Sequence, residues 1–402
     1  MPINERSILT AQLLALGQQV ARAEQAVQNQ QPDQFPQNRA AQPLLQTAQN
    51  LRGRVDGLRD AVGERNAPSP PDWQALRDLR PQVAALSGEC LAFVQGVALR
   101  TGGVDDGLCA LADTLLDEVA STTQQLAWLR YTVPAEREFV NDLAQVVRVR
   151  VPDVGIWSLP MAVHEFGHFY GPRIEERHPT TGAVDRPLDL MLRGERQAGG
   201  VEAWSHLHER FADLFAVYAT GPAYACTCVL LRLDATRAAE SEWTHPSPNA
   251  RAYLTLKGLG PVLAGAPGLL GDYREIDREL GLHWDRIRTA AGQGPLAEDE
   301  RDEADGWFNR LFPLLQQGSL ARYNGWLAVQ RLAGAIDPRN DSEAVAQPGE
   351  GLRDVLNAAW LVRLRYWDEP FAVREIGARA KQLCAAIRAA RIPRPGGGQA
   401  AP

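Results

Sequence analysis

The chain has 402 residues, of which 45% are hydrophobic and 23% are charged, and its formal net charge is -7. This length allows about two or three domains with sizeable cores. The negative, interspersed charge argues against a nucleic-acid partner and against an anionic surface, because such partners usually select a basic patch.

The first 130 residues show a helical pattern and few residues suited to catalysis. Apolar side chains recur at spacings of four and three, as on one face of a packed helix: Leu44, Ala48, Leu51, Val55, Leu58 and Val62. The pattern predicts four helices in a bundle or antiparallel coiled coil over residues 1–133. This region is either a module that binds a protein partner or, equally, a structural domain.

The pattern changes at Val146. The β-branched run Val146–Val151 predicts a strand. A turn then leads to Ser158, which we expect to cap a helix that begins near Pro160 and runs to about Tyr170, where Gly171 and Pro172 follow.

A second strong helix is predicted from near Glu202 to Gly221-Pro222. The segment between the two helices, Arg173–Val201, is polar, contains glycine and lacks clear periodicity. It is predicted to form either a flap over a cleft or a mobile surface loop.

Helical patterns continue to residue 391. We expect helices over Ala250–Lys257, Tyr273–Gly281, Glu298–Phe312, Leu320–Leu332, Leu352–Leu364 and Glu369–Arg391. They form a predicted helical region over 261–392 that packs on a domain at 134–260, and the glycine-rich residues 393–402 form a disordered tail.

The most specific motif lies on the predicted helix that ends at Tyr170. His164-Glu165-Phe166-Gly167-His168 fits the pattern H-E-x-x-H. Two histidines four residues apart lie one turn above each other, so both imidazoles can reach one cation. Glu165 is offset around the helix and can contact a water bound to that cation.

A matching carboxylate pair lies on the second helix. Glu209 and Asp213 are four residues apart in an E-x-x-A-D pattern. One carboxylate can complete a set of three metal ligands, while the other can accept a hydrogen bond from the far nitrogen of a ligand histidine. Such a set leaves one metal position open, as in catalytic zinc sites.

These two motifs together resemble the gluzincin branch of the zincin metallopeptidases. The resemblance covers about Val146 to Tyr253, roughly a quarter of the chain. It implies a zincin-like α+β domain in which His164, His168 and Glu209 bind one Zn²⁺ per chain. It also implies that Glu165 is the general base and that Asp213 orients His164.

A looser likeness follows downstream, where His245-Pro246 precedes Arg251. It is similar to a segment of membrane-embedded gluzincins that process prenylated proteins. Because no run of about eighteen apolar residues occurs here, a membrane span is not predicted and the substrates of those enzymes do not carry over.

Two alternatives concern the metal ligands. The motif extends to H-E-x-x-H-x-x-G, the opening of the metzincin motif, but the third histidine of that motif is replaced by Ile174, which cannot bind zinc. His206 is a rival third ligand because it lies three residues before Glu209, whereas His208 is expected to point elsewhere.

A hydrolase of this type needs a donor for the developing oxyanion. The candidates are His245, ranked first, and Tyr224 and Tyr218, with Tyr170 behind them. Tyr224 follows the Gly221-Pro222 break, so its side chain can point back at the metal.

The site predicts a mechanism and a substrate. Zinc lowers the pKa of its bound water to about 7, and Glu165 transfers the proton of that water to the leaving amine. If Val146–Val151 lies at a sheet edge beside the cleft, it can bind an extended peptide by strand addition. The chain is therefore predicted to be a zinc metallopeptidase acting on a peptide or protein.

Two rival functions belong to other classes. One is a zincin-fold sensor or scaffold that cleaves one dedicated partner or itself, and the other is a catalytically silent helical interaction protein. The presence of Glu165 argues against the second, because a site that only binds a metal needs no such base.

The cysteines bear on the compartment. Cys226 and Cys228 are too close for an easy disulfide, and the other three of the five fall in apolar helical patterns. No signal peptide is evident at Met1. We expect no disulfides and a cytoplasmic protein that is mainly α-helical.

Overall fold

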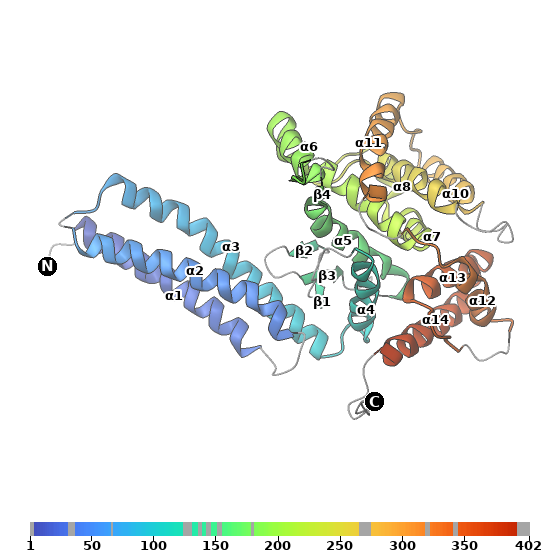
Figure 1. Ribbon diagram of the computed structural model, residues 1–402, viewed down its shortest axis with the longest axis horizontal. Helices are drawn as coiled ribbons and strands as arrows, with labels where there is room; N and C mark the ends of the chain where they lie inside the picture. The colour runs from blue at the N-terminus through green and yellow to red at the C-terminus, as the bar shows by residue number, and fades with distance from the viewer. Residues whose placement is uncertain are drawn as a thin grey trace. The chain divides into compact units, whose positions relative to one another are not determined.

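A computed structural model shows the chain to be mainly helical, as predicted, with few strands (Figure 1). The structure describes residues 4–30, 37–65, 67–123, 131–135, 139–141, 146–150, 155–177, 181–264, 275–317, 322–340 and 345–391. The chain divides into two compact units, and each is described by itself. The first comprises Met1–Cys109 and Trp128–Pro152, and the second comprises Ala110–Ala127 and Asp153–Pro402.

Three long helices build most of the first unit: α1 (Glu5–Asn29), α2 (Gln37–Gly63) and α3 (Pro70–Thr101). They pack side by side around one apolar core. The predicted apolar stripe of α2 lies in this core, with Leu58 partly buried and the other five residues buried. Asn4 caps α1, and Ser69 with Asp72 forms a capping box at α3. Three packed helices therefore account for the predicted helical pattern up to Thr101.

A three-stranded sheet completes the first unit. Its strands are β1 (Tyr131–Ala135), β2 (Phe139–Asn141) and β3 (Val146–Arg150). The predicted strand, β3, lies in the middle, because β1 pairs with it in parallel and β2 pairs with it antiparallel. Val146, Val147 and Arg148 are paired on both sides, so β3 is not an edge strand, and the condition for peptide binding by strand addition is not met.

The fourth predicted helix is α4 (Leu108–Ser121), and nearly all of it belongs to the second unit. The reason is the buried carboxylate of Glu118, which accepts the backbone N–H groups of Leu352 and Arg353 at the start of α13 (Leu352–Arg365). The three strands conversely lie in the first unit. The units therefore interleave along the chain and do not follow the predicted boundary at residue 133.

Beyond residue 247 the second unit has one helix for each that was predicted: α8 (Pro248–Leu263), α10 (Ile276–Ala290), α11 (Glu298–Gln317), α12 (Trp326–Ile336), α13 and α14 (Pro370–Arg391). The ends of some differ, since α10 runs to Ala290 and not to Gly281. Shorter turns of helix are η1 (Ile156–Ser158), η2 (Gly171–Arg173), α7 (Pro222–Thr227), η3 (Cys228–Arg232) and η4 (Ala235–Arg237). The predicted disordered tail, 393–402, lies outside the described residues.

The two helices with the motifs are α5 (Pro160–Tyr170) and α6 (Pro187–Thr220). They pack closely because small residues meet at the crossing, where a Cβ on Gly167 would lie 3.1 Å from the Cα of Ala212. The predicted end at Tyr170 is confirmed, but Ser158 does not cap α5. It ends η1, where its hydroxyl bonds to Gly155.

The segment Arg173–Val201 is more regular than its sequence indicates. It contains a small hairpin, β4 (Glu176–Arg177) with β5 (Val184–Asp185), and then the first half of α6. Gly200 breaks α6 with a φ of 79°, a conformation that favours glycine. The strong helix therefore begins after Gly200, close to the predicted start at Glu202.

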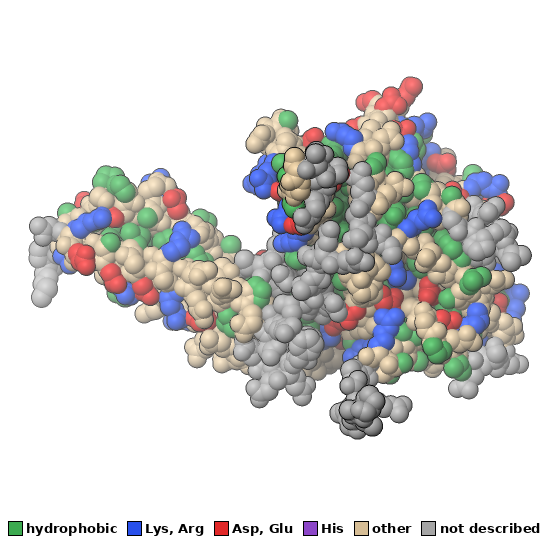
Figure 2. All heavy atoms as spheres, viewed as in Figure 1, with side chains coloured by type: hydrophobic (Ala, Val, Ile, Leu, Met, Phe, Trp, Pro, Cys, Tyr) green, Lys and Arg blue, Asp and Glu red, His purple; other side chains and the backbone are tan. Residues whose placement is uncertain are grey.

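All five cysteines are buried and free, as predicted. Among the described helices, α3 alone is long and apolar enough by length and composition to cross a membrane, a test that core helices of globular units also pass. Its residues Leu79, Val83 and Leu86 are buried in the core of the first unit. Positive and negative side chains are interspersed on the surface shown in Figure 2, in line with the mixed charge of the sequence.

Candidate metal centre

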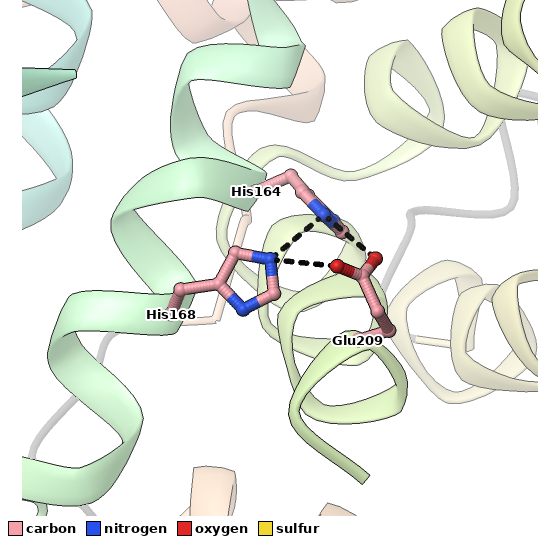
Figure 3. Close-up of side chains that lie close together, drawn as sticks. All are labelled: His164, His168 and Glu209. Carbon is pink, nitrogen blue, oxygen red and sulfur yellow. Dashed lines mark hydrogen bonds and ion pairs between the residues drawn. The ribbon is translucent and has the colours of Figure 1, made fainter. Parts of the chain in front are cut away.

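The two histidines of the H-E-x-x-H motif present their Nε2 atoms to one point beside α5 (Figure 3). These two atoms are 3.2 Å apart, and the two rings meet edge to face with centroids 4.8 Å apart. The spacing of four residues thus has the predicted effect, because it places both imidazoles on one face of the helix.

Glu209 of α6 completes the group. Its Oε2 is 3.4 Å from Nε2 of His164, and its Oε1 is 3.3 Å from Nε2 of His168. A tetrahedral ion with bonds of about 2.0–2.1 Å separates its ligand atoms by about 3.3–3.4 Å. The nitrogens and oxygens of the three side chains thus lie at about this spacing, although each imidazole faces a different oxygen of Glu209. Among the described residues, these three side chains form a group that could hold a metal ion.

The charge state of Glu209 also fits a cation. Burial by itself raises its pKa, but the positive charges of His168 and Arg251 outweigh this effect and hold the pKa well below the usual range. Its Oε2 is buried without a hydrogen-bond partner among the described residues. A buried carboxylate oxygen is costly unless an ion or a donor satisfies it, and the nearest cationic groups, on His164 and Arg251, both lie 3.4 Å away. This oxygen can therefore form a closer bond with a metal ion.

Asp213, one turn after Glu209, is fully buried behind His164. Its Oδ1 lies 3.0 Å from Nδ1 of His164, on the side of the ring opposite to Nε2. Arg251 of α8 donates to both carboxylate oxygens, with bonds of 2.8 and 2.9 Å. Burial opposes ionisation of Asp213, but the Arg251 charge outweighs it and lowers the pKa of the carboxyl group.

Arg251 therefore forms a buried ion pair with Asp213 and not a surface one. Its guanidinium is largely buried, and it also approaches Oε2 of Glu209 at 3.4 Å. It compensates both carboxylates at once. The only sequence signal for this role is the looser likeness around His245 and Arg251, whose spacing says nothing of the contact.

The neighbouring carboxylates change the pKa of His164. Burial lowers its pKa, but the hydrogen bonds to Asp213 and Glu209 outweigh burial and raise the pKa to about 10. In the metal-free protein the ring is therefore an imidazolium at neutral pH. A bound metal must displace that proton, which is the usual competition at histidine ligands.

Tyr224 of α7 has a different place from the one predicted. Its hydroxyl lies 2.5 Å from Oδ1 of Asp213 and 3.0 Å from Nδ1 of His164. It thus faces the side of the imidazole away from Nε2, where it cannot reach an oxyanion formed at the metal. Burial, reinforced by the charge of Asp213, raises the pKa of this phenol well above its usual value.

The remaining candidates for the oxyanion donor differ in their distance from the metal group and in their exposure. His245 has its Nε2 3.4 Å from Oε1 of Glu209, and its side chain is 43% exposed, so it lies beside the metal group and open to solvent. Burial is the main cause that lowers its pKa, which favours a neutral ring. Tyr218 packs against Phe312, and Tyr170 is fully buried with no partner for its hydroxyl among the described residues.

The other two histidines of α6 also differ. His206 directs its Nε2 to the carbonyl oxygen of Glu242, 2.8 Å away, and does not join the metal group. His208 was expected to point elsewhere, but its ring packs edge-on against that of His168, with centroids 4.7 Å apart. Its Nε2 lies 2.9 Å from the carbonyl oxygen of His168. Burial lowers its pKa to about 3, so it is neutral.

Glu165 is buried on α5, directly after His164. Its role as the general base stays a prediction. No family model matches this chain, and neither the curated proteins nor the solved structures with which it was compared include a match. The function is therefore argued from the site alone.

Proposed function

We propose that this protein is a zinc-dependent peptidase whose ion is held by His164, His168 and Glu209. One observation carries the proposal, namely the convergence of two imidazole nitrogens 3.2 Å apart on one buried carboxylate, whose two oxygens lie 3.3 and 3.4 Å from them. The set has two imidazoles and one carboxylate, which leaves a fourth position for water. The resemblance to gluzincins in the two motifs adds support.

Zinc bound by these residues supplies a water of lowered pKa and a Lewis acid for the substrate carbonyl. Glu165 accepts the proton of the attacking water at its carboxylate and returns it to the leaving amine. His245, at the solvent-exposed side of Glu209, is the side chain placed to donate to the carbonyl oxygen. Asp213 holds His164 from behind, and Arg251 keeps Asp213 ionised.

A peptide or protein is the substrate that we infer for this reaction. The presence of Glu165 beside the ligands favours hydrolysis over a purely structural metal site, because a structural site has no use for a base next to an open position. The rival function is the binding of a protein partner by the helices of the first unit. We propose no site for it among the described residues of that unit.

The test combines metal analysis with one isosteric substitution. The purified protein should contain about one zinc per chain, and Glu165→Gln should keep the zinc while losing hydrolysis of a peptide library. The matched control is Glu375→Gln, because Glu375 is an exposed glutamate on α14 that pairs with Arg379 and is not part of the ligand group. Turnover by Glu165→Gln near that of the control would contradict the proposal.

A further inference from the structure

The hydroxyl of Tyr224 is one corner of a buried triangle with Oδ1 of Asp213 and Nδ1 of His164. The three edges measure 2.5 Å from Tyr224 to Asp213, 3.0 Å from Tyr224 to His164, and 3.0 Å from Asp213 to His164. All three side chains are buried, so water does not compete for these bonds. Each group in the triangle therefore bonds to the other two, while Arg251 adds two bonds to Asp213 and the Cys228 thiol adds a contact with Tyr224.

The direction of each hydrogen bond follows from which group holds a proton. Asp213 is paired with Arg251 through both oxygens, so it is a carboxylate and accepts only. The Tyr224 hydroxyl must then donate to Asp213, which agrees with the short distance of a charge-assisted O–H bond. After this donation its oxygen can only accept, and it faces Nδ1 of His164.

Two acceptors thus face Nδ1 of His164. This arrangement requires a proton on Nδ1 and leaves Nε2 as the nitrogen with a free lone pair when the ring is neutral. Nε2 is the atom directed at His168 and Glu209. The ring of Tyr224 lies nearly parallel to that of His164, with 6° between the planes, so the phenol also limits rotation of the imidazole.

The chain is built to bring Tyr224 to this place. Gly221 turns the backbone sharply after α6, with a φ of 69°, and α7 begins at the next residue. A Cβ on Gly221 would lie 2.7 Å from the ring of Tyr323, so glycine is needed here for space as well as for conformation. Asn357 then accepts the N–H of Ala223 at 2.8 Å and fixes the start of α7.

We propose that Tyr224 is a positioning residue, whose hydroxyl holds His164 in the tautomer and orientation that a metal at Nε2 requires, jointly with Asp213. The inference rests on the proposed metal site and assigns a residue that the two motifs do not contain. Without the hydroxyl, Nδ1 keeps one acceptor, and Oδ1 of Asp213 is left to Arg251 and His164 alone.

The test compares Tyr224→Phe with Tyr170→Phe in the full-length protein. Both changes remove one hydroxyl from a fully buried tyrosine of the second unit, but the Tyr170 hydroxyl has no partner among the described residues. Competition with a graded chelator gives the zinc dissociation constant. Tyr224→Phe should weaken it by about tenfold, in the range typical of groups that orient a ligand histidine, and Tyr170→Phe should leave it unchanged. Visible absorption of the cobalt-substituted proteins should change only for Tyr224→Phe.

An unchanged zinc dissociation constant and cobalt spectrum in Tyr224→Phe would overturn the inference. Should Tyr224→Phe not fold, the wild-type zinc protein decides, because ¹⁵N-histidine spectra should show the Nδ1–H tautomer at His164, and an Nε2–H tautomer there would overturn it. The inference holds if Tyr224→Phe loses zinc affinity even when the wild type cleaves no peptide, a result that would contradict only the proposed function. A wild type that binds no zinc would overturn both.

Discussion

Asp213 bonds to three partners at once, so the effects of Asp213→Asn on the site can be worked out in advance. The carboxylate bonds twice to Arg251, once to Tyr224 and once to His164, and it is fully buried. Asparagine keeps the size and one acceptor oxygen but removes the charge. Two separate losses should follow.

The first loss is in metal affinity. With an amide behind it, His164 is held less firmly and Nε2 becomes a weaker ligand, so the zinc dissociation constant should rise about 10–100-fold. The second loss is in stability, because the buried Arg251 cation keeps only Glu209 as a charged partner, at 3.4 Å. Breaking a buried ion pair on one side costs about 3–5 kcal/mol, and the retained oxygen places this change near the lower value.

A matched control lies in the same unit. Asp305 also bonds to a cation and a tyrosine, Lys257 at 2.5 Å and Tyr253 at 2.7 Å, but it is 37% exposed, and neither of these partners is a histidine. Asp305→Asn should cost less than about 1 kcal/mol and leave zinc binding unchanged.

The assays are chelator competition for zinc and chemical denaturation of the metal-free proteins. If Asp213→Asn loses stability but keeps the wild-type zinc dissociation constant, Asp213 serves Arg251 only, and its role toward His164 is refuted. If neither quantity changes, the buried network itself is refuted.

Two further predictions concern the ligands and their protons. Glu209→Ala should remove most of the bound zinc and His206→Ala should not, since His206 bonds to a backbone carbonyl outside the group, and metal content after dialysis reveals the reverse order if it occurs. Because the pKa of His164 is raised from 6.5 to about 10, its protonated form stabilises the metal-free fold fully below pH 6.5, and the free energy of unfolding should fall as the pH rises from 6.5 to 10. Zinc must displace this proton, so the zinc dissociation constant should rise about tenfold for each unit by which the pH falls in that window. The released proton can be detected by titrating zinc into a weakly buffered solution of the protein. A zinc affinity independent of pH would contradict the protonated state of His164.

Much of the helical architecture could be predicted because it depends on local features of the chain. Apolar periodicity located the helices beyond residue 247 to within several residues, and Gly171 and Gly221 marked the ends of α5 and α6. The H-E-x-x-H and E-x-x-A-D spacings determined which side chains share a helix face, since that geometry follows from 3.6 residues per turn.

Other features depend on contacts between distant segments, and the sequence could not settle them. The residue pattern of Val146–Arg150 predicts a strand but does not show whether the strand lies at the edge or in the middle of a sheet. Only its pairing with β1 and β2 shows that it lies in the middle. Residues 187–199 have no clear periodicity, yet they form a helix up to the break at Gly200. Likewise, α4 joins the second unit through Glu118, a contact made more than two hundred residues away.

In the candidate metal centre, too, some features follow from the sequence and others only from the tertiary structure. The sequence by itself determined the candidate ligands and the base, because each motif lies within one helix. Only the tertiary structure decided that Gly167 and Ala212 let the two helices approach, and that Arg251 neutralises two carboxylates. It also moved Tyr224 from the expected oxyanion side to the back of His164, because the turn at Gly221 sets the direction of a side chain that no spacing rule describes.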